Sequence, residues 1–183
     1  MTDRLRAHLA ACQRWFRRED GTATIEFVLM IPILMTVFMA CFEAGLMTLR
    51  QTMLERALDI AMRDLRLGHL GLAPTHDDLK DAICANSSIL TECDSTLMVS
   101  LDRVSQDDWV LPGVEVVCRD RASEIEPVTT LDPAPGARSV IMLVRVCLRA
   151  DAIFPSTGIA ANIDQDGQGG YRLVAASAFM NEP

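Results

Sequence analysis

The feature that most constrains this chain is a long apolar segment close to its N-terminus. Sixteen uncharged residues follow Glu26, and beyond the carboxylate of Glu43 six more run to Leu49. As a helix, the 23 residues from Phe27 to Leu49 would be about 35 Å long, enough to cross a hydrocarbon core of ~30 Å with some tilt. The segment predicts a single membrane-spanning helix, which we place at residues 22–49.

The helical pattern continues beyond the expected membrane segment. An apolar stripe at helical spacing predicts an amphipathic extension over residues 50–68; it consists of Met47, Leu54, Leu58, Ala61 and Leu65. Gly68 and Gly71 are expected to end the helix, because glycine readily adopts the left-handed conformation of a helix C-terminus. Pro32 predicts a kink in the span, since proline removes a backbone donor and clashes with the carbonyl one turn earlier.

Residues 69–183 have the pattern of a small domain. Thr75, followed by acidic residues, is a suitable N-cap for a short helix. Four short β-type runs come later, separated by turn residues: Thr96–Arg103, Val114–Arg119, Ser139–Arg149 and Gly170–Met180. We expect them to form an antiparallel sheet with a helix over one face. The predicted fold class is therefore α+β, a long N-terminal helix packed on a small antiparallel sheet.

The charge of the chain is unevenly divided. Residues 1–21 carry five arginines and a net charge of +2, whereas residues 69–183 carry eight basic and seventeen acidic side chains, a net charge of −9. An acidic body argues against nucleic-acid binding, which needs a basic face to displace counterions. Basic residues flank the apolar segment equally on both sides, so they do not decide its orientation in a membrane.

Four of the six cysteines lie in the acidic body, and no pair has the C-x-x-C spacing of a redox or zinc site. The even number is consistent with two disulfides in an oxidising compartment, with buried free thiols or a metal site as alternatives. We prefer the pairs Cys84 with Cys93 and Cys118 with Cys147, because the latter two lie in candidate strands that could be neighbours. Disulfides favour a body outside the cytoplasm.

The body offers few candidates for a metal or catalytic site. Asn162, Asp164 and Asp166 place oxygen donors at every second residue, as in the first half of a calcium loop, but the twelfth position is Leu173. Aspartate and glycine suit an ordinary surface turn equally well. A membrane-tethered enzyme would have to use His76 or the pair Asp164 and Asp166, which form no recognisable nucleophilic arrangement. We predict no metal, no cofactor and no enzymatic activity.

The start of the apolar segment has a second distinctive feature. Gly21 separates the arginine-containing leader from the segment, and Glu26 follows five residues later. An acid near the end of a membrane helix either reaches water at headgroup level or serves a function. Cleavage after Gly21 would give Thr22 a new ammonium group, which could neutralise Glu26 of the same or a neighbouring helix. The other acid, Glu43, is expected to be solvated at the membrane boundary or paired with another subunit.

This junction resembles the processing site of type IV prepilins. The order Gly21, Thr22, Glu26 and Phe27, with a proline shortly afterwards and a continuing amphipathic helix, is similar to the TadE-like proteins of tight-adherence (Tad) pilus systems. The resemblance implies a pilin-like fold, cleavage after Gly21 by a prepilin peptidase, and a role as minor pilin or pseudopilin. Phe27 corresponds to the aromatic residue beside the glutamate. The resemblance does not separate TadE from its sister TadF.

Together, these observations predict a processed single-pass subunit with a leader at residues 1–21 and an extracytoplasmic domain at residues 69–183. Its expected partners are membrane lipid, the peptidase, other pilin-like subunits and the Tad assembly platform of the inner membrane. We expect it in that membrane, with incorporation into a surface pilus as a further step. The alternative is an uncleaved, membrane-anchored scaffold of an envelope complex, which would keep Met1 instead of beginning at Thr22.

Overall fold

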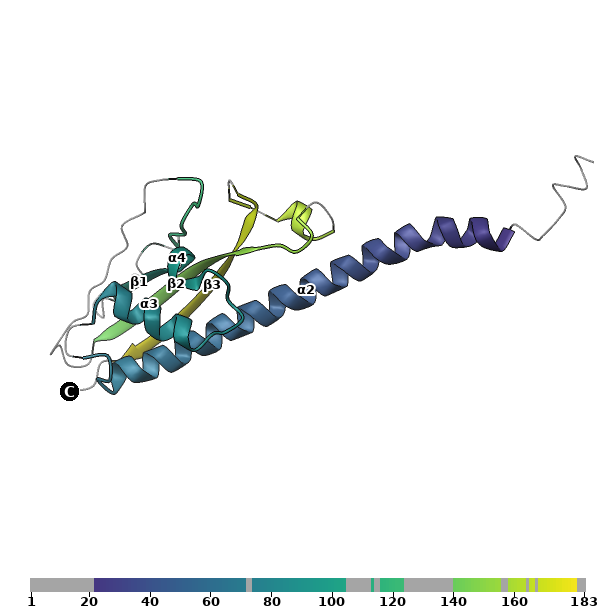
Figure 1. Ribbon diagram of the computed structural model, residues 1–183. Helices are drawn as coiled ribbons and strands as arrows, with labels where there is room; N and C mark the ends of the chain where they lie inside the picture. The colour runs from purple at the N-terminus through teal and green to yellow at the C-terminus, as the bar shows by residue number, and fades with distance from the viewer. Residues whose placement is uncertain are drawn as a thin grey trace, which may run out of the picture.

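The structure combines one very long helix with a small α+β domain. The computed structural model describes residues 22–71, 74–104, 113, 116–123, 140–155, 158–163, 165–166 and 168–180. Helix α2 (Thr22–Arg66) is followed by α3 (His76–Ala85), α4 (Cys93–Thr96), β1 (Met98–Val104), β2 (Ile141–Asp151), η2 (Ala160–Asn162) and β3 (Gly170–Met180). The C-terminal half of α2 lies along the domain, and its N-terminal half projects freely (Figure 1). The predicted fold class is confirmed.

The three strands form an antiparallel sheet in the order β1-β2-β3. Because side chains alternate along a strand, one face of the central strand β2 is apolar throughout and faces the core. That face consists of Met142, Val144, Val146, Leu148 and Ala150. Helices α2 and α3 cover it, with Leu54, Leu58 and Ala61 from α2 and Leu79 and Ile83 from α3 among the fully buried residues. The core of the domain therefore includes the second half of the long helix.

The predicted fourth strand, Val114–Arg119, is wrong over its described part. Residues 116–119 belong to no strand, and residues 114–115 lie outside the described chain. The disulfide between Cys118 and Cys147 brings this segment to β2, whose two edges are already paired with β1 and β3. Cys147 lies between core-facing residues of β2 and so points to the opposite face. The segment therefore covers that face instead of joining the sheet.

Helix α2 ends at its predicted glycine. Gly68 has a φ of 73°, the left-handed conformation that glycine tolerates. Its N–H donates to the carbonyl of Leu65 at 3.1 Å, and the N–H of His69 donates to the carbonyl of Asp64 at 3.0 Å. This pair of hydrogen bonds is a Schellman motif, which satisfies carbonyls left open at a helix C-terminus.

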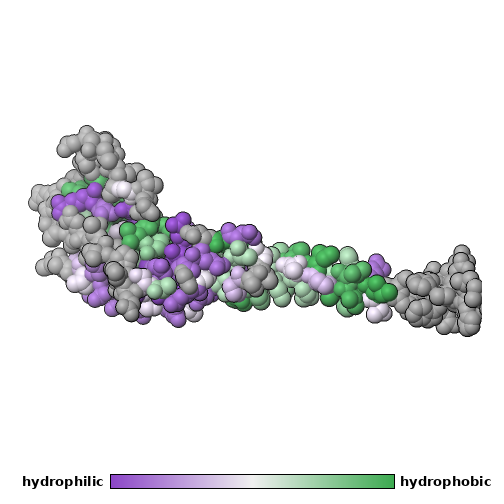
Figure 2. Space-filling model, turned by 90° about the horizontal axis from the view of Figure 1, so that it is seen from above, coloured by the Kyte–Doolittle hydropathy of each residue, from purple (hydrophilic) through white to green (hydrophobic). Residues whose placement is uncertain are grey.

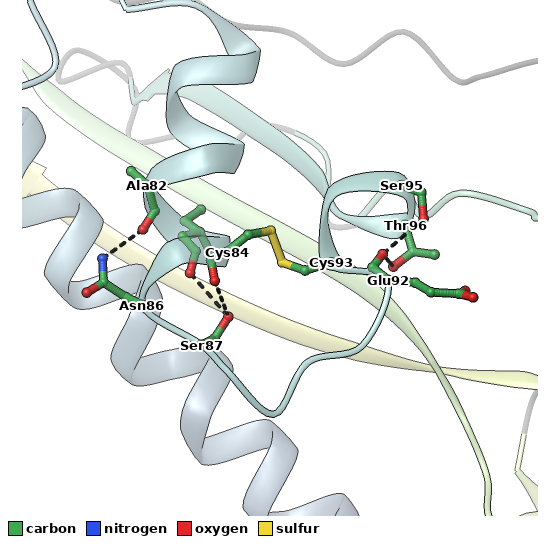
Figure 3. The surroundings of a disulfide bond; sticks show 9 residues. Ala82, Cys84, Asn86, Ser87, Glu92, Cys93, Ser95 and Thr96 are labelled. Carbon is green, nitrogen blue, oxygen red and sulfur yellow. Dashed lines mark hydrogen bonds between the residues drawn. A yellow bond between two sulfur atoms is a disulfide. The ribbon is translucent and has the colours of Figure 1, made fainter.

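The short helices are held together by caps and a disulfide. Thr75 caps α3 as predicted: Asp78 N–H donates to its hydroxyl, and Asp78 accepts in return from the backbone N–H of Thr75. The disulfide between Cys84 and Cys93 joins the end of α3 to α4 (Figure 3). Both disulfides are the pairs that the sequence analysis preferred.

Candidate functional site

The free half of α2 is the most unusual surface of the described protein. Residues 23–38 are exposed along almost their whole length, and large apolar side chains dominate them. Phe27, Leu29 and Phe38 are 63%, 66% and 64% exposed. Figure 2 shows this rod as mainly hydrophobic, in contrast to the hydrophilic surface of the domain. The helix is long and apolar enough to cross a membrane, and a soluble environment would leave far more apolar surface in water than monomeric proteins tolerate.

Glu26 interrupts this apolar surface near its N-terminal end. It is exposed, and the residues three and four positions away on the helix that the structure describes, Ala23, Leu29 and Met30, are exposed and apolar. These neighbours in the described helix therefore offer Glu26 no counter-charge. Gly21, the other half of the predicted junction, lies outside the described residues, as does the side chain of Thr22.

Helix α2 continues through Pro32 without a break, and it bends gently toward its N-terminal end (Figure 1). Hydroxyl groups further along the helix bond back to its own carbonyls: Thr36 to Ile33 at 2.8 Å and Thr48 to Ala44 at 2.8 Å. Such bonds satisfy side-chain donors without a partner molecule, which suits a helix surrounded by lipid.

The domain begins to contact α2 at residues 40–43. Gly158 packs on Ala40 so closely that a Cβ at position 158 would lie 3.0 Å from the Ala40 Cβ. Its φ of 60° adds to the need for glycine there. The rings of Phe42 and Phe154 meet edge to face with centroids 6.5 Å apart. The loop after β2 thus closes against the helix where its exposed half ends.

Glu43 fastens this loop to the helix. Its side chain is 1% exposed. One carboxylate oxygen accepts from the N–H of Ile153 at 3.1 Å and from that of Phe154 at 3.2 Å. Both expectations for Glu43, solvation at the boundary or pairing with another subunit, are wrong, because the loop of the same chain occupies its carboxylate. Hydrogen bonds from backbone N–H groups to an ionised carboxylate are charge-assisted, and such bonds are stronger than neutral ones.

Arg50 lies about two turns further along the same face. It is 9% exposed and donates to the carbonyl of Asp151 at 2.6 Å and to the hydroxyl of Tyr171 at 2.8 Å. Burial raises the pKa of Tyr171 and outweighs the opposing effect of Arg50. Two ionisable residues of α2 are thus buried against the end of β2 and the start of β3.

The sequence did contain a signal for these two residues. The apolar stripe of α2 begins in the prediction at Met47; Arg50 fits its helical spacing between Met47 and Leu54, and Glu43 fits it one turn before Met47. Charged residues on a buried stripe must find partners in the fold, because an unpaired buried charge is very costly. The stripe could therefore have identified both as buried, but it could not have identified their partners.

A second charged cluster surrounds Arg121, a residue that was not among the predicted sites. Its guanidinium binds Asp166 at 2.8 Å and Asp151 at 2.6 Å, and lies 3.7 Å from Glu92. The two hydrogen-bonded aspartates raise the pKa of Arg121. Burial would raise the pKa of Asp166, but hydrogen bonds from Arg121 and from the backbone of Gly170 and Gln168 lower it to about 2. The cluster joins the loop before β3 to the segment that follows Cys118.

This cluster also removes the calcium interpretation of Asp166. Its oxygens accept from Arg121 and from backbone N–H groups, so a cation already occupies the place of a metal ion. Asn162 is exposed and its amide donates to the carbonyl of Gly158 at 3.1 Å. Asp164, the third candidate, lies outside the described residues.

Fold and site together define a class of protein: a small α+β domain carried on a long helix whose free half is apolar enough to cross a membrane. Residues 21–63 match the family model described as TadE-like protein, and the predicted resemblance to the TadE-like family is confirmed over this segment. The match begins at Gly21 and includes Glu26, Glu43 and Arg50. No curated protein matches the chain, and no solved structure matches it.

Proposed function

We propose that this protein is a minor pilin or pseudopilin of a Tad pilus system, cleaved after Gly21 by a prepilin peptidase. The observation that carries the proposal is the free half of α2, an exposed apolar helix that directly follows the junction and continues into the domain core. The family match supports it, because the matching segment begins at the predicted junction. The size of the domain favours a minor component, since the major pilins of Tad systems resemble the helix alone, with little added to it.

The proposed mechanism is association between helices. In the inner membrane the apolar surface of residues 23–42 contacts lipid, and in the assembled state it contacts helices of other pilin-like subunits. Glu26 sets the axial register, because a misplaced neighbour would leave its charge unpaired in an apolar environment. We assign the new ammonium group of Thr22, on this or an adjacent subunit, as the cation that pairs with Glu26.

Three kinds of partner follow from this mechanism. The peptidase recognises the junction before assembly, the inner-membrane Tad platform receives the anchored subunit, and other pilin-like chains pack on its helix. The domain would lie outside the cytoplasm, where the two disulfides are stable. The proposal assigns the protein a role in assembly and no catalysis.

The decisive experiment is the mass of the mature N-terminus in membranes that contain the peptidase. We expect a chain that begins at Thr22. Gly21→Val should block cleavage and leave the longer form, because the peptidase must accommodate a small residue there. Gly45→Val is the matched control, since a Cβ at Gly45 meets no atom within 4 Å and lies far from the junction. A functional chain that keeps Met1 would instead favour the uncleaved scaffold.

A further inference from the structure

A group of partly exposed apolar side chains, none of them part of the core, lies where α2 leaves the domain. Phe42 and Ile153 are 51% and 48% exposed, and Ile159 is 40% exposed. Phe154 joins them through its ring contact with Phe42. We call these four residues the collar. They adjoin the exposed apolar half of the helix, and the loop that carries three of them reaches furthest along α2 toward its free half (Figure 1).

The loop after β2 is uncharged, in contrast to the net charge of the domain. Although residues 69–183 carry a net charge of −9, no charged residue occurs between Asp151 and Asp164. Anionic headgroups would repel an acidic surface within a Debye length. An uncharged loop at the helix exit can therefore approach a membrane surface without an electrostatic penalty.

We propose that the collar lies in the interfacial layer of the bilayer and fixes the depth at which α2 leaves it. The occupant of this apolar surface is lipid, because the surface is continuous with the helix half that crosses the membrane; the inference thus rests on the membrane anchoring in the proposed function. Aromatic and apolar side chains at such a level are common interfacial anchors.

The collar changes the expected limits of the membrane span. If the bilayer ends at Phe42, the segment Thr22–Phe42 is about 31 Å long and matches a ~30 Å hydrocarbon core. The span predicted from composition reached Leu49, about 10 Å further along the helix. That longer span would place the buried carboxylate of Glu43 and its loop in the hydrocarbon region. The structure therefore favours an exit before Glu43, with Glu26 just inside the opposite boundary.

Spin labels can measure this depth in the full-length chain. Single cysteines at Ile153, Ile159, Phe38, Leu49 and Leu67 are introduced into a chain that has serine in place of Cys12 and Cys41. The labelled proteins are inserted into vesicles of phosphatidylethanolamine and phosphatidylglycerol. Collision rates with oxygen, which concentrates in lipid, are compared with those of a water-soluble nickel chelate. All five positions are at least 40% exposed, and retention of both disulfides checks the fold of each variant.

We expect labels at Ile153→Cys and Ile159→Cys to be several-fold less accessible to nickel than the label at Leu67→Cys. The label at Phe38→Cys should lie in lipid, and the label at Leu49→Cys should be reached by nickel. If positions 153 and 159 behave like 67 while 38 remains in lipid, the collar inference is overturned and the anchor stands. If 38 is also open to nickel, the anchoring itself fails and the proposed function fails with it.

A charge placed in the collar provides an independent test. Ile159→Asp should raise the whole domain away from the membrane, because a carboxylate is poorly tolerated at the interface of an anionic bilayer. The label at Phe38→Cys should then move toward the headgroups. Leu67→Asp is the matched control at the far end of α2 and should leave the depth at position 38 unchanged. Equal depths in the two variants would overturn the inference.

Discussion

The two halves of helix α2 have opposite surroundings, although each carries large apolar side chains and a glutamate within an apolar run. In the free half, apolar side chains and Glu26 are exposed; in the packed half, apolar side chains and Glu43 are buried. The helix itself is continuous, so local backbone structure does not cause the difference. It arises because the sheet, α3 and the loop after β2 pack only on the second half. One helix therefore has two roles, as a free apolar surface and as part of a domain core.

The largest expected difference in stability comes from shortening one leucine in each half of α2. Leu54→Ala should lower the free energy of unfolding by about 2–5 kcal/mol, because it leaves a cavity in a closed core. Leu34→Ala removes the same atoms from a side chain that is 56% exposed and should change the unfolding of the domain by less than about 0.5 kcal/mol. Denaturant unfolding in detergent, followed by circular dichroism, measures both. Similar losses would show that the free half also packs on the domain.

A smaller effect is expected from the two glutamates. Glu43→Ala leaves the N–H groups of Ile153 and Phe154 without their acceptor and should cost about 1–3 kcal/mol. Glu43→Gln keeps one acceptor oxygen and should cost less. Glu26→Ala should leave domain unfolding unchanged but weaken assembly, which is read from surface piliation. Normal piliation with Glu26→Ala would count against a role in register.

The smallest effect is expected on the stability of the fold at low pH. The folded protein lowers the pKa of Asp166 from 3.8 to about 2. Its contribution to stability is therefore fully present above pH ~4 and is lost as the pH falls toward 2, a change of about 1–2 kcal/mol. Asp166→Asn should flatten this part of the stability profile. The free half of α2 should not respond, so its helical signal in detergent should stay constant over the same range. An unchanged acid profile in Asp166→Asn would contradict the ion pair with Arg121.

Much of the fold could be predicted because its signals are local. The spacing of apolar residues placed the packed face of α2, and Gly68 and Thr75 marked a helix end and a helix start. The preferred disulfide pairs are the observed ones, although Cys118 lies outside the strand that was the reason for pairing it with Cys147. The strand expected at Val114–Arg119 failed over its described part, because an apolar run looks the same whether it pairs at an edge or crosses the face of a sheet.

Partners distant in the sequence could not be predicted in this way. Arg121 is an ordinary surface arginine by its local sequence, yet the fold brings Asp151 and Asp166 to it. The apolar stripe of α2 places Glu43 on the packed face, but its partners, the backbone N–H groups of Ile153 and Phe154, lie more than a hundred residues away. Such pairings depend on the arrangement of the domain, which no short window of sequence contains.

By itself, the sequence determined that this protein has a long apolar helix, an acidic domain with four cysteines, and a glycine–glutamate junction at the start of the helix. Composition and periodicity are properties of the chain, so they can be read without the fold. Only the tertiary structure decided where the helix becomes part of the core, because burial depends on which residues a loop more than a hundred positions away covers. That boundary, at residues 40–43, determines how much of the apolar surface of α2 remains exposed.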